Sequence, residues 1–141
     1  MTWADRTLAT STAQFGAQQV GPAHQDAEVV LADPLDGSAK LNMNAAGKIV
    51  LVERGNVAFV EKAMNAQNAG AAAVIIYNNQ DEGPVGMAGD SGTISKQITI
   101  PVVSISQTDG AQLAAAINAG RTTLSFQSES CYLCLQCPRM Y

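Results

Sequence analysis

The chain has 141 residues, of which 47% are apolar and 14% are charged. This length and composition suit a single domain with a hydrophobic core and exclude a largely disordered chain. The formal net charge is −4, and the eight Lys and Arg residues are scattered. Binding to nucleic acid or to an anionic membrane needs clustered positive charge, so neither is predicted. No run approaches the roughly 18 apolar residues of a membrane span, so membrane insertion is not predicted.

The first part of the chain is polar and rich in turn residues. Residues 1–26 carry many Thr, Ser, Ala, Gln and Gly residues and predict an extended lead-in with one edge strand. Their start lacks the charged-then-apolar order of a signal peptide, which leaves a cytosolic protein, a mature chain or an excised domain as alternatives. A short apolar run at 29–31 predicts a strand, and the Asp, Pro and Gly residues at 33–37 predict turns after it.

A strand–helix–strand unit occupies the middle of the chain. The segment "GKIVLVERG" (47–55) holds a continuous apolar run between glycines, which is typical of a strand buried on both faces. Asn56 is predicted as the N-cap of the following helix and Gly70 as its left-handed C-terminal stop. The strand "AAAVIIYNN" (71–79) follows, so the two strands are predicted to be parallel and joined by a right-handed crossover. The predicted sheet-facing residues of the helix are Phe59, Ala63, Ala66 and Gly70.

A long, polar, Gly-rich loop at 80–97 separates this unit from a third core strand. A loop of that length in a compact domain is predicted to be either functional or mobile. The third strand is "ITIPVVSIS" (98–106). Because proline cannot donate to a sheet ladder, Pro101 is expected to place this strand at a sheet edge or in a bulge.

A second helix and a closing strand complete the predicted domain. Ser106 and Asp109 have the spacing of a capping box, with Asp in place of the usual Glu, and Gly120 is predicted to end the helix. The alternating pattern of "TTLSFQS" (122–128) predicts the strand. The buried stripe of the helix is predicted to be Leu113, Ala116 and Ile117.

Motifs for catalysis and metal binding are incomplete. The segment "GDSG" (89–92) resembles the surroundings of the nucleophilic serine of trypsin-like proteases, and His24 precedes it. Such enzymes build their site between two β-barrels, so we interpret the segment as a Gly-rich turn and His24 as a solvated side chain. The pair Asp81-Glu82 lacks the spacing of a Ca²⁺ loop, and no G-x-G-x-x-G follows the first core strand. No catalytic residue, metal site or cofactor is predicted.

Three cysteines form a C-x2-C-x2-C run near the end of the sequence: Cys131, Cys134 and Cys137. The spacing begins a ferredoxin-type cluster signature, but the fourth Cys is missing. A structural Zn²⁺ site would also need a fourth ligand. We interpret the run as part of a following Cys-rich module or as a source of inter-chain disulfides, with a metal site as the less favoured alternative.

Several segments, in order, resemble the protease-associated (PA) domain family. They lie within residues 27–120 and read "VLADP", "GKIVLVERG", "FVEKAMNAQNAGAAAVIIYNN", "GDSG" and "ITIPVVSIS" with its helix. The resemblance implies an α/β fold of the swivelling β/β/α type, in which a mixed β-sheet or open barrel is flanked by two main helices. It also implies no catalysis, and it makes "GDSG" the Gly/Asp-rich loop of the family.

The same resemblance indicates where such domains act. PA domains occur inserted in subtilisin-like proteases and zinc aminopeptidases, in vacuolar sorting receptors and in lumen-facing ubiquitin ligases, with proposed roles in ligand recognition, access control and self-association. Many members carry a Cys after the "RG" turn and a partner Cys before the first core strand. Val57 and Ser38 occupy those places here, so the internal disulfide is expected to be absent. That departure weakens a peptide-cargo mode built on this loop and weakens the secreted assignment.

The sequence therefore predicts a non-catalytic interaction module at 27–126, with a lead-in at 1–26 and a Cys-containing tail at 127–141. Its partner is expected to be a peptide or protein, including a second copy of the chain, in a secreted or lumenal compartment. The alternatives are a self-associating extracellular subunit linked through the C-terminal cysteines and a regulatory or lid fragment of a larger secreted protease. The ligand surface is predicted at strand ends, where open α/β sheets bind ligands: Arg54, Gly55, Asn56, Asn78, Asn79 and Asp81.

Overall fold

The computed structural model describes most of the segment that carries the family resemblance. The described residues are 2–3, 6–16, 27–81, 83–84, 86–87, 97–120 and 122–125. Three features singled out in the sequence lie outside these ranges: His24, the "GDSG" segment and the cysteine run at 131, 134 and 137.

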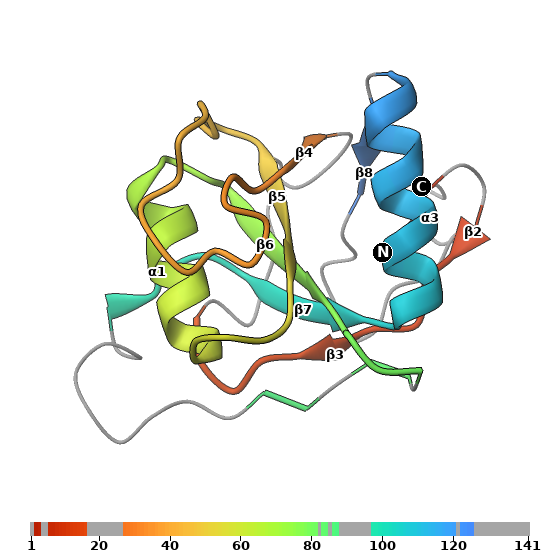
Figure 1. Ribbon diagram of the computed structural model, residues 1–141, viewed down its shortest axis with the longest axis horizontal. Helices are drawn as coiled ribbons and strands as arrows, with labels where there is room; N and C mark the ends of the chain where they lie inside the picture. Colours follow the sequence, from red (N-terminus) through yellow and green to blue (C-terminus); the bar gives the residue numbers. More distant parts are fainter. Residues whose placement is uncertain are drawn as a thin grey trace, which may run out of the picture.

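One mixed sheet of six strands forms the centre of the fold, in the order β3-β7-β6-β5-β4-β8 (Figure 1). The four central strands run parallel, and the outer strands β3 and β8 are antiparallel to their neighbours. A separate antiparallel pair joins β1 to β2. The predicted α/β fold is confirmed, and the sheet is open rather than closed into a barrel. The strands are β1 (Thr2–Trp3), β2 (Arg6–Thr7), β3 (Ser11–Thr12), β4 (Ala27–Leu31), β5 (Ile49–Glu53), β6 (Ala73–Tyr77), β7 (Val102–Ile105) and β8 (Thr122–Leu124).

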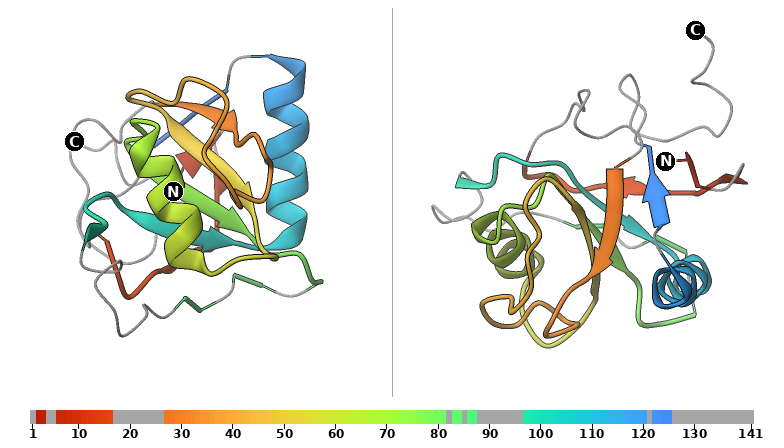
Figure 2. Two further views of the ribbon diagram at one scale, coloured as in Figure 1. Left: turned by 60° about the vertical axis from the view of Figure 1, so that its left-hand side comes forward. Right: turned by 90° about the horizontal axis from the view of Figure 1, so that it is seen from above.

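Helices α1 (Phe59–Asn68) and α3 (Gln107–Ala119) cover opposite faces of this sheet (Figure 2). Alternate residues of β5 explain how one strand supports both layers. Val50 and Val52 pack in the apolar cluster that contains the buried apolar residues of α1. Ile49 and Leu51 pack in the cluster that contains Leu113 of α3. These four residues of β5 are fully buried, which explains why the strand has a continuous apolar run instead of an alternating pattern.

The segment before β4 contributes to this core and changes the environment of β7. Leu8 and Phe15 are buried, and β3 pairs with β7. β7 is therefore not an edge strand, which corrects the expectation from Pro101. The proline lies immediately before β7, where its missing N–H removes no bond from the ladder. Its carbonyl accepts a hydrogen bond from the Val74 N–H at 3.0 Å. The division of the chain at residues 27 and 126 stays a prediction.

Helix α1 begins later than the sequence predicted. Asn56 is not the N-cap; that position belongs to Ala58, which has no side-chain cap. Asn56 instead takes a left-handed conformation with φ 75°. The cause is an additional turn between strand and helix, in which the Val57 N–H donates to the Gly55 carbonyl at 2.9 Å. The asparagine is thereby placed in the turn rather than at the helix.

Other predicted features of the two helices are confirmed. Gly70 has the left-handed conformation of a helix stop, with φ 93°. The Ser106 hydroxyl caps α3 by accepting a hydrogen bond from the Asp109 N–H at 3.1 Å. Ala63 and Ala66 are fully buried, and their small side chains let α1 lie close to the sheet. The local signals for the end of α1 and the start of α3 are thus confirmed, and of the predicted apolar faces Ala63, Ala66 and Leu113 are fully buried while Phe59, Ala116 and Ile117 are partly buried.

Close packing of α3 on β6 depends on a glycine. A Cβ atom on Gly110 would lie 2.2 Å from Cβ and 2.4 Å from Cγ of Tyr77. Helix propensity alone favours Ala over Gly by about 1 kcal/mol, but overpacking typically costs about 1–3 kcal/mol. Because the contact involves the base of the Tyr77 side chain, which cannot rotate away, the overpacking cost should lie at the upper end of its range and exceed the propensity gain. We therefore expect Gly110→Ala to lower the free energy of unfolding by about 1–2 kcal/mol in urea denaturation.

Gly120→Ala is the matched control for this experiment, because no atom lies within 4 Å of its Cβ position and its backbone is extended at φ 165°. Its effect should stay within about 0.5 kcal/mol. Tyr77→Ala removes Cγ and Cδ2 but keeps the Cβ atom, so it should relieve part of the clash, and Gly110→Ala should cost somewhat less in that background. A Gly110→Ala chain as stable as the unsubstituted one would contradict the packing argument.

Candidate functional site

Two turns meet at the carboxyl ends of β5 and β6. The strands are parallel neighbours with Glu53 opposite Tyr77, so the residues that follow them emerge at the same edge of the sheet. The Arg54 Nη1 donates a hydrogen bond to Asn78 Oδ1 at 2.8 Å. The Asn79 amide nitrogen lies so close to Gly55 that a Cβ there would be 3.1 Å from it. The structure thus brings together the turn residues that the sequence had placed at separate strand ends.

Asn78 and Asn79 have different environments. Asn78 is only 1% exposed, and both polar atoms of its side chain form hydrogen bonds. Its Oδ1 also accepts from the Gln80 N–H at 3.2 Å, and its Nδ2 donates to the Gly83 carbonyl at 2.9 Å. Asn79 is exposed. Asn78 therefore orders the two turns, and Asn79 is the asparagine of this pair that solvent can reach.

A third turn, at residues 33–37, completes the surface. The Leu35 carbonyl accepts a hydrogen bond from the Glu53 N–H at 2.9 Å, and the Asn56 Nδ2 donates to Asp36 Oδ2 at 2.9 Å. Leu35 is 39% exposed, and no other large apolar residue within the described ranges is as open to solvent. We call residues 35–37, 54–56 and 78–80 the rim. The sequence analysis had identified 33–37 only as turns.

Lys62 connects the rim to α1. Its side chain is fully buried, and its Nζ donates hydrogen bonds to the backbone carbonyls of Asp36 and Gly55. One helical turn later, the Asn65 Nδ2 donates to the Gly37 carbonyl at 2.8 Å. Burial lowers the pKa of Lys62 below its ordinary value, because desolvation penalises the ammonium form. Two turns from distant parts of the sequence are thus held by one buried side chain.

Sequence reasoning missed Lys62, although a weak signal exists. Lys62 stands four residues before Ala66, and side chains at that spacing lie on the same side of a helix. A lysine on the apolar side of a helix can mark a buried cation. Long side chains of this type more often extend to the surface, however, so spacing alone does not separate the two cases.

Asp36 is the ionisable group of the rim whose pKa is shifted from its ordinary value. Hydrogen bonds from the Ser38 side chain, the Asn56 side chain and the Ser38 backbone stabilise its carboxylate. These bonds hold the pKa of Asp36 below its ordinary value of 3.8. The carboxylate is therefore ionised at neutral pH.

In contrast, Asp81, the last of the predicted site residues, is exposed and has no hydrogen bond or ion pair to the rim within the described part of the chain.

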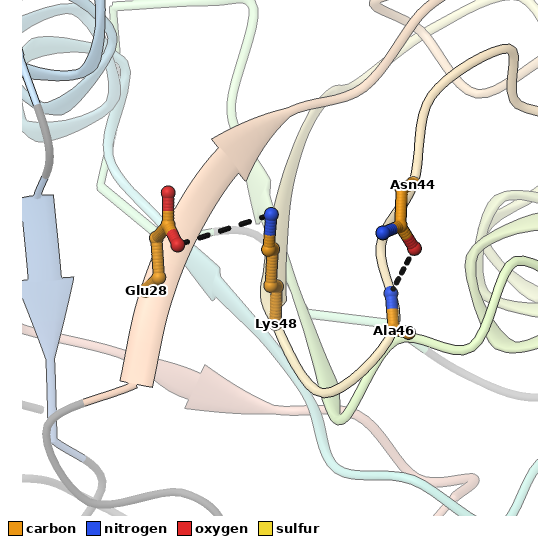
Figure 3. Close-up of polar contacts among 4 residues, drawn as sticks. All are labelled: Glu28, Asn44, Ala46 and Lys48. Carbon is orange, nitrogen blue, oxygen red and sulfur yellow. Dashed lines mark hydrogen bonds and ion pairs between the residues drawn. The ribbon is translucent and has the colours of Figure 1, made fainter.

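At the other end of the strands, near the start of β5, the polar contacts are fewer than in the rim (Figure 3). The Lys48 Nζ lies 3.8 Å from Glu28 Oε1, and both side chains are about one-third exposed, at 31% and 32%. Nearby, Asn44 Oδ1 accepts a hydrogen bond from the Ala46 N–H at 3.0 Å. Lys48 is therefore a partly exposed lysine that can be compared with the buried Lys62 in the same domain.

Across the described residues, no group of three or more His, Cys, Asp or Glu side chains is placed to hold a metal ion. None of the helices in those ranges combines the length and apolar character needed to cross a membrane.

The chain matches one known protein family over most of its length. A family model described as the PA domain matches residues 14–113. The chain belongs to the PA domain family. The match confirms the resemblance drawn from the sequence, and it begins before β4, in the segment that supplies Phe15 to the core.

Several curated relatives of this PA domain are peptidases. The chain is 34% identical over 102 residues to the minor extracellular protease Vpr of Bacillus subtilis, covering 71% of this chain and 12% of that protein. It is 43% identical over 82 residues to the probable leucine aminopeptidase 2 of Arthroderma benhamiae (58% and 16%). It is 38% identical over 103 residues to signal peptide peptidase-like 2 of Arabidopsis thaliana (72% and 19%). The chain thus spans less than a fifth of each of these relatives.

Solved structures agree with the fold. The zinc aminopeptidase BSAP from Bacillus subtilis superposes with a TM-score of 0.67 at 28% sequence identity, covering 93% of this chain and 30% of that one. The subtilisin-like protease Apa1 from Pseudoalteromonas sp. AS-11 superposes with a TM-score of 0.51 at 23% identity, covering 92% and 31%. The second match shows the fold alone.

Substitution of Lys62 tests its role in the rim. Lys62→Met keeps the length and apolar stem of the side chain but removes the donor, so the Asp36 and Gly55 carbonyls lose a buried partner. We expect the free energy of unfolding to fall by about 1–3 kcal/mol. The matched control, Lys48→Met, removes a partly exposed ion pair and should change it by less than about 1 kcal/mol. Equal or higher stability of Lys62→Met would show that the desolvation cost of the ammonium outweighs its hydrogen bonds.

The lowered pKa of Asp36 predicts an acid-dependent contribution to stability. Because the folded-state pKa lies below the ordinary value of 3.8, folding favours the ionised carboxylate. This contribution is complete above the unfolded pKa and is lost as the pH falls through the folded pKa. The difference in unfolding free energy between the unsubstituted chain and Asp36→Asn, measured by urea denaturation, should therefore shrink as the pH falls below about 5. A difference that stays constant down to pH 2 would contradict the assignment.

Proposed function

We propose that this chain is a non-catalytic PA module that binds a peptide or protein segment at the rim. The observation that carries the proposal is the construction of the rim itself. Three turns are joined by the Arg54–Asn78 hydrogen bond and by the two bonds of the buried Lys62. A surface ordered before its ligand arrives loses less conformational entropy on binding.

The outward-facing groups of the rim suit a polypeptide ligand. Asn56 and Asn79 are exposed, and their amides can donate to and accept from the peptide backbone. Leu35 adds an apolar contact, and the ionised Asp36 adds an acceptor beside it. Relatives of this PA domain include proteases, whose substrates are polypeptides, and this context supports the same class of ligand.

A second candidate is a regulatory or lid segment of a larger secreted or lumenal protease. It is favoured by the coverage of the relatives, since the chain corresponds to 12% of the protease Vpr and 16% of a probable leucine aminopeptidase. The word extracellular in the name of Vpr supports a location outside the cytosol. On this proposal the catalytic residues belong to another part of the polypeptide. Self-association through Cys131, Cys134 and Cys137 stays a prediction from the sequence.

Selection of peptides against the full chain tests the rim. Peptides recovered from a random phage-displayed library would be measured by calorimetry against the Asn79→Ala and Leu35→Ala variants. Both substitutions remove exposed groups from the rim, so we expect each to weaken binding about tenfold, which corresponds to about 1.4 kcal/mol.

Asn118→Ala is the matched control, because Asn118 is equally exposed but lies near the end of α3, away from the rim. It should leave the affinity unchanged. Selected peptides that bind all three variants as tightly as the unsubstituted chain would place the ligand elsewhere and overturn the assignment of the rim.

A further inference from the structure

A hollow of about 440 Å³ lies between the outer side of α1 and the segment at residues 40–41. Its volume falls within the range of small-ligand sites, about 300–1,000 Å³. None of its lining residues belongs to the rim, and the proposed function does not use it. The lining residues are Lys40, Leu41, Asn65, Asn68 and Ala69.

The polar groups of the hollow are available to a ligand. Lys40 and Asn68 are exposed, and within the described part of the chain neither side chain has a hydrogen-bond or ion-pair partner. Asn65 uses its Nδ2 to bond the Gly37 carbonyl, which leaves its Oδ1 as an acceptor. One cation, one amide and one further acceptor thus face the same space without a partner from the described residues.

The remaining lining is apolar and small. Leu41 is 6% exposed and anchors the segment in the core, and Ala69 is partly buried at the end of α1. Near the end of the helix, the carbonyls of residues 65–67 accept hydrogen bonds from the N–H groups of residues 69–71, which reduces the negative potential there. Among the five lining residues, Lys40 is the one with an ionisable side chain, so its ammonium is the full charge at the hollow.

We propose that this hollow binds an extended peptide segment through an acidic side chain. The Lys40 ammonium would pair with the Asp or Glu carboxylate of the ligand. Asn65 and Asn68 are one helical turn apart, which separates their Cβ atoms by about 5–6 Å. Residues on one side of an extended strand repeat about every 6.6 Å, so the two amides match backbone groups on both sides of the acidic residue. A free carboxyl terminus would offer the charge but no chain on its far side.

The probe that tests this site is a matched set of short peptides titrated into the ¹⁵N-labelled full chain by NMR. Acetyl-Ala-Glu-Ala-amide should produce saturable shifts at residues 40–41 and 65–69, with a dissociation constant roughly in the millimolar range. The neutral analogue acetyl-Ala-Gln-Ala-amide should bind at least about fivefold more weakly, because it lacks the charge that Lys40 pairs with. Acetyl-Ala-Ala with a free carboxyl terminus should also bind more weakly, because it has no continuing chain.

Substitutions separate a specific site from general charge attraction. Lys40→Gln and Asn68→Leu should each weaken binding of the Glu peptide about fivefold or more. Lys48→Gln makes the same change of net charge away from the hollow and should have no effect. The rim variant Asn79→Ala should also have no effect, which distinguishes this site from the proposed ligand surface.

Four outcomes would overturn the proposal: no shifts at residues 40–41 and 65–69, equal affinity for the Glu and Gln peptides, tighter binding of the free carboxyl terminus, or equal losses in Lys40→Gln and Lys48→Gln. The substituted side chains of Lys40 and Asn68 are exposed, so the variants are expected to keep the fold. Their urea midpoints check that expectation in the same samples.

Discussion

The buried ammonium of Lys62 is the interaction on which the rim depends. It holds the carbonyls of Asp36 and Gly55, which come from two different connections of the sheet. A buried lysine is costly unless its donors are satisfied, so the position of the side chain and the shape of both turns are mutually dependent. Asn56 reinforces the same junction from the surface by bonding to the Asp36 carboxylate. The rim is consequently part of the packed structure of α1, not an independent set of loops.

The sheet gives this arrangement a rigid base. Its central parallel strands are covered on both faces, so β5 and β6 end at positions determined by core packing. Small residues make the close approach of the helices possible: Ala63 and Ala66 on α1 face the sheet, and Gly110 of α3 lies against Tyr77. The rigidity that follows from such packing is what allows the turns beyond the strands to keep one conformation.

Two surfaces of different chemistry therefore lie on the same side of the domain as α1. The rim has exposed amides, a carboxylate and one apolar side chain, whereas the hollow beside α1 has an exposed cation and two asparagines. Asn65 connects the two surfaces, because it lines the hollow and its side chain bonds to Gly37 of the rim. A PA module with two separate contact surfaces could bind a polypeptide and a neighbouring part of a larger protein at the same time.

The amino-acid sequence by itself determined the main core elements and the parallel pairing of β5 with β6. The apolar run at 49–52, the small face of α1 and the cap at Ser106 are local patterns, and local patterns specify strands, helices and their ends. Parallel strands also place residues 54–56 and 78–79 at one edge. Only the tertiary structure decided that Asn78 is buried, that Asn56 lies in a turn and that Lys62 is a structural cation. Asn78 bonds to Arg54 and Gly83, whereas Asn56 and Lys62 bond to the 33–37 turn. These are contacts between turns and strand ends brought together by the fold, which local spacing does not encode.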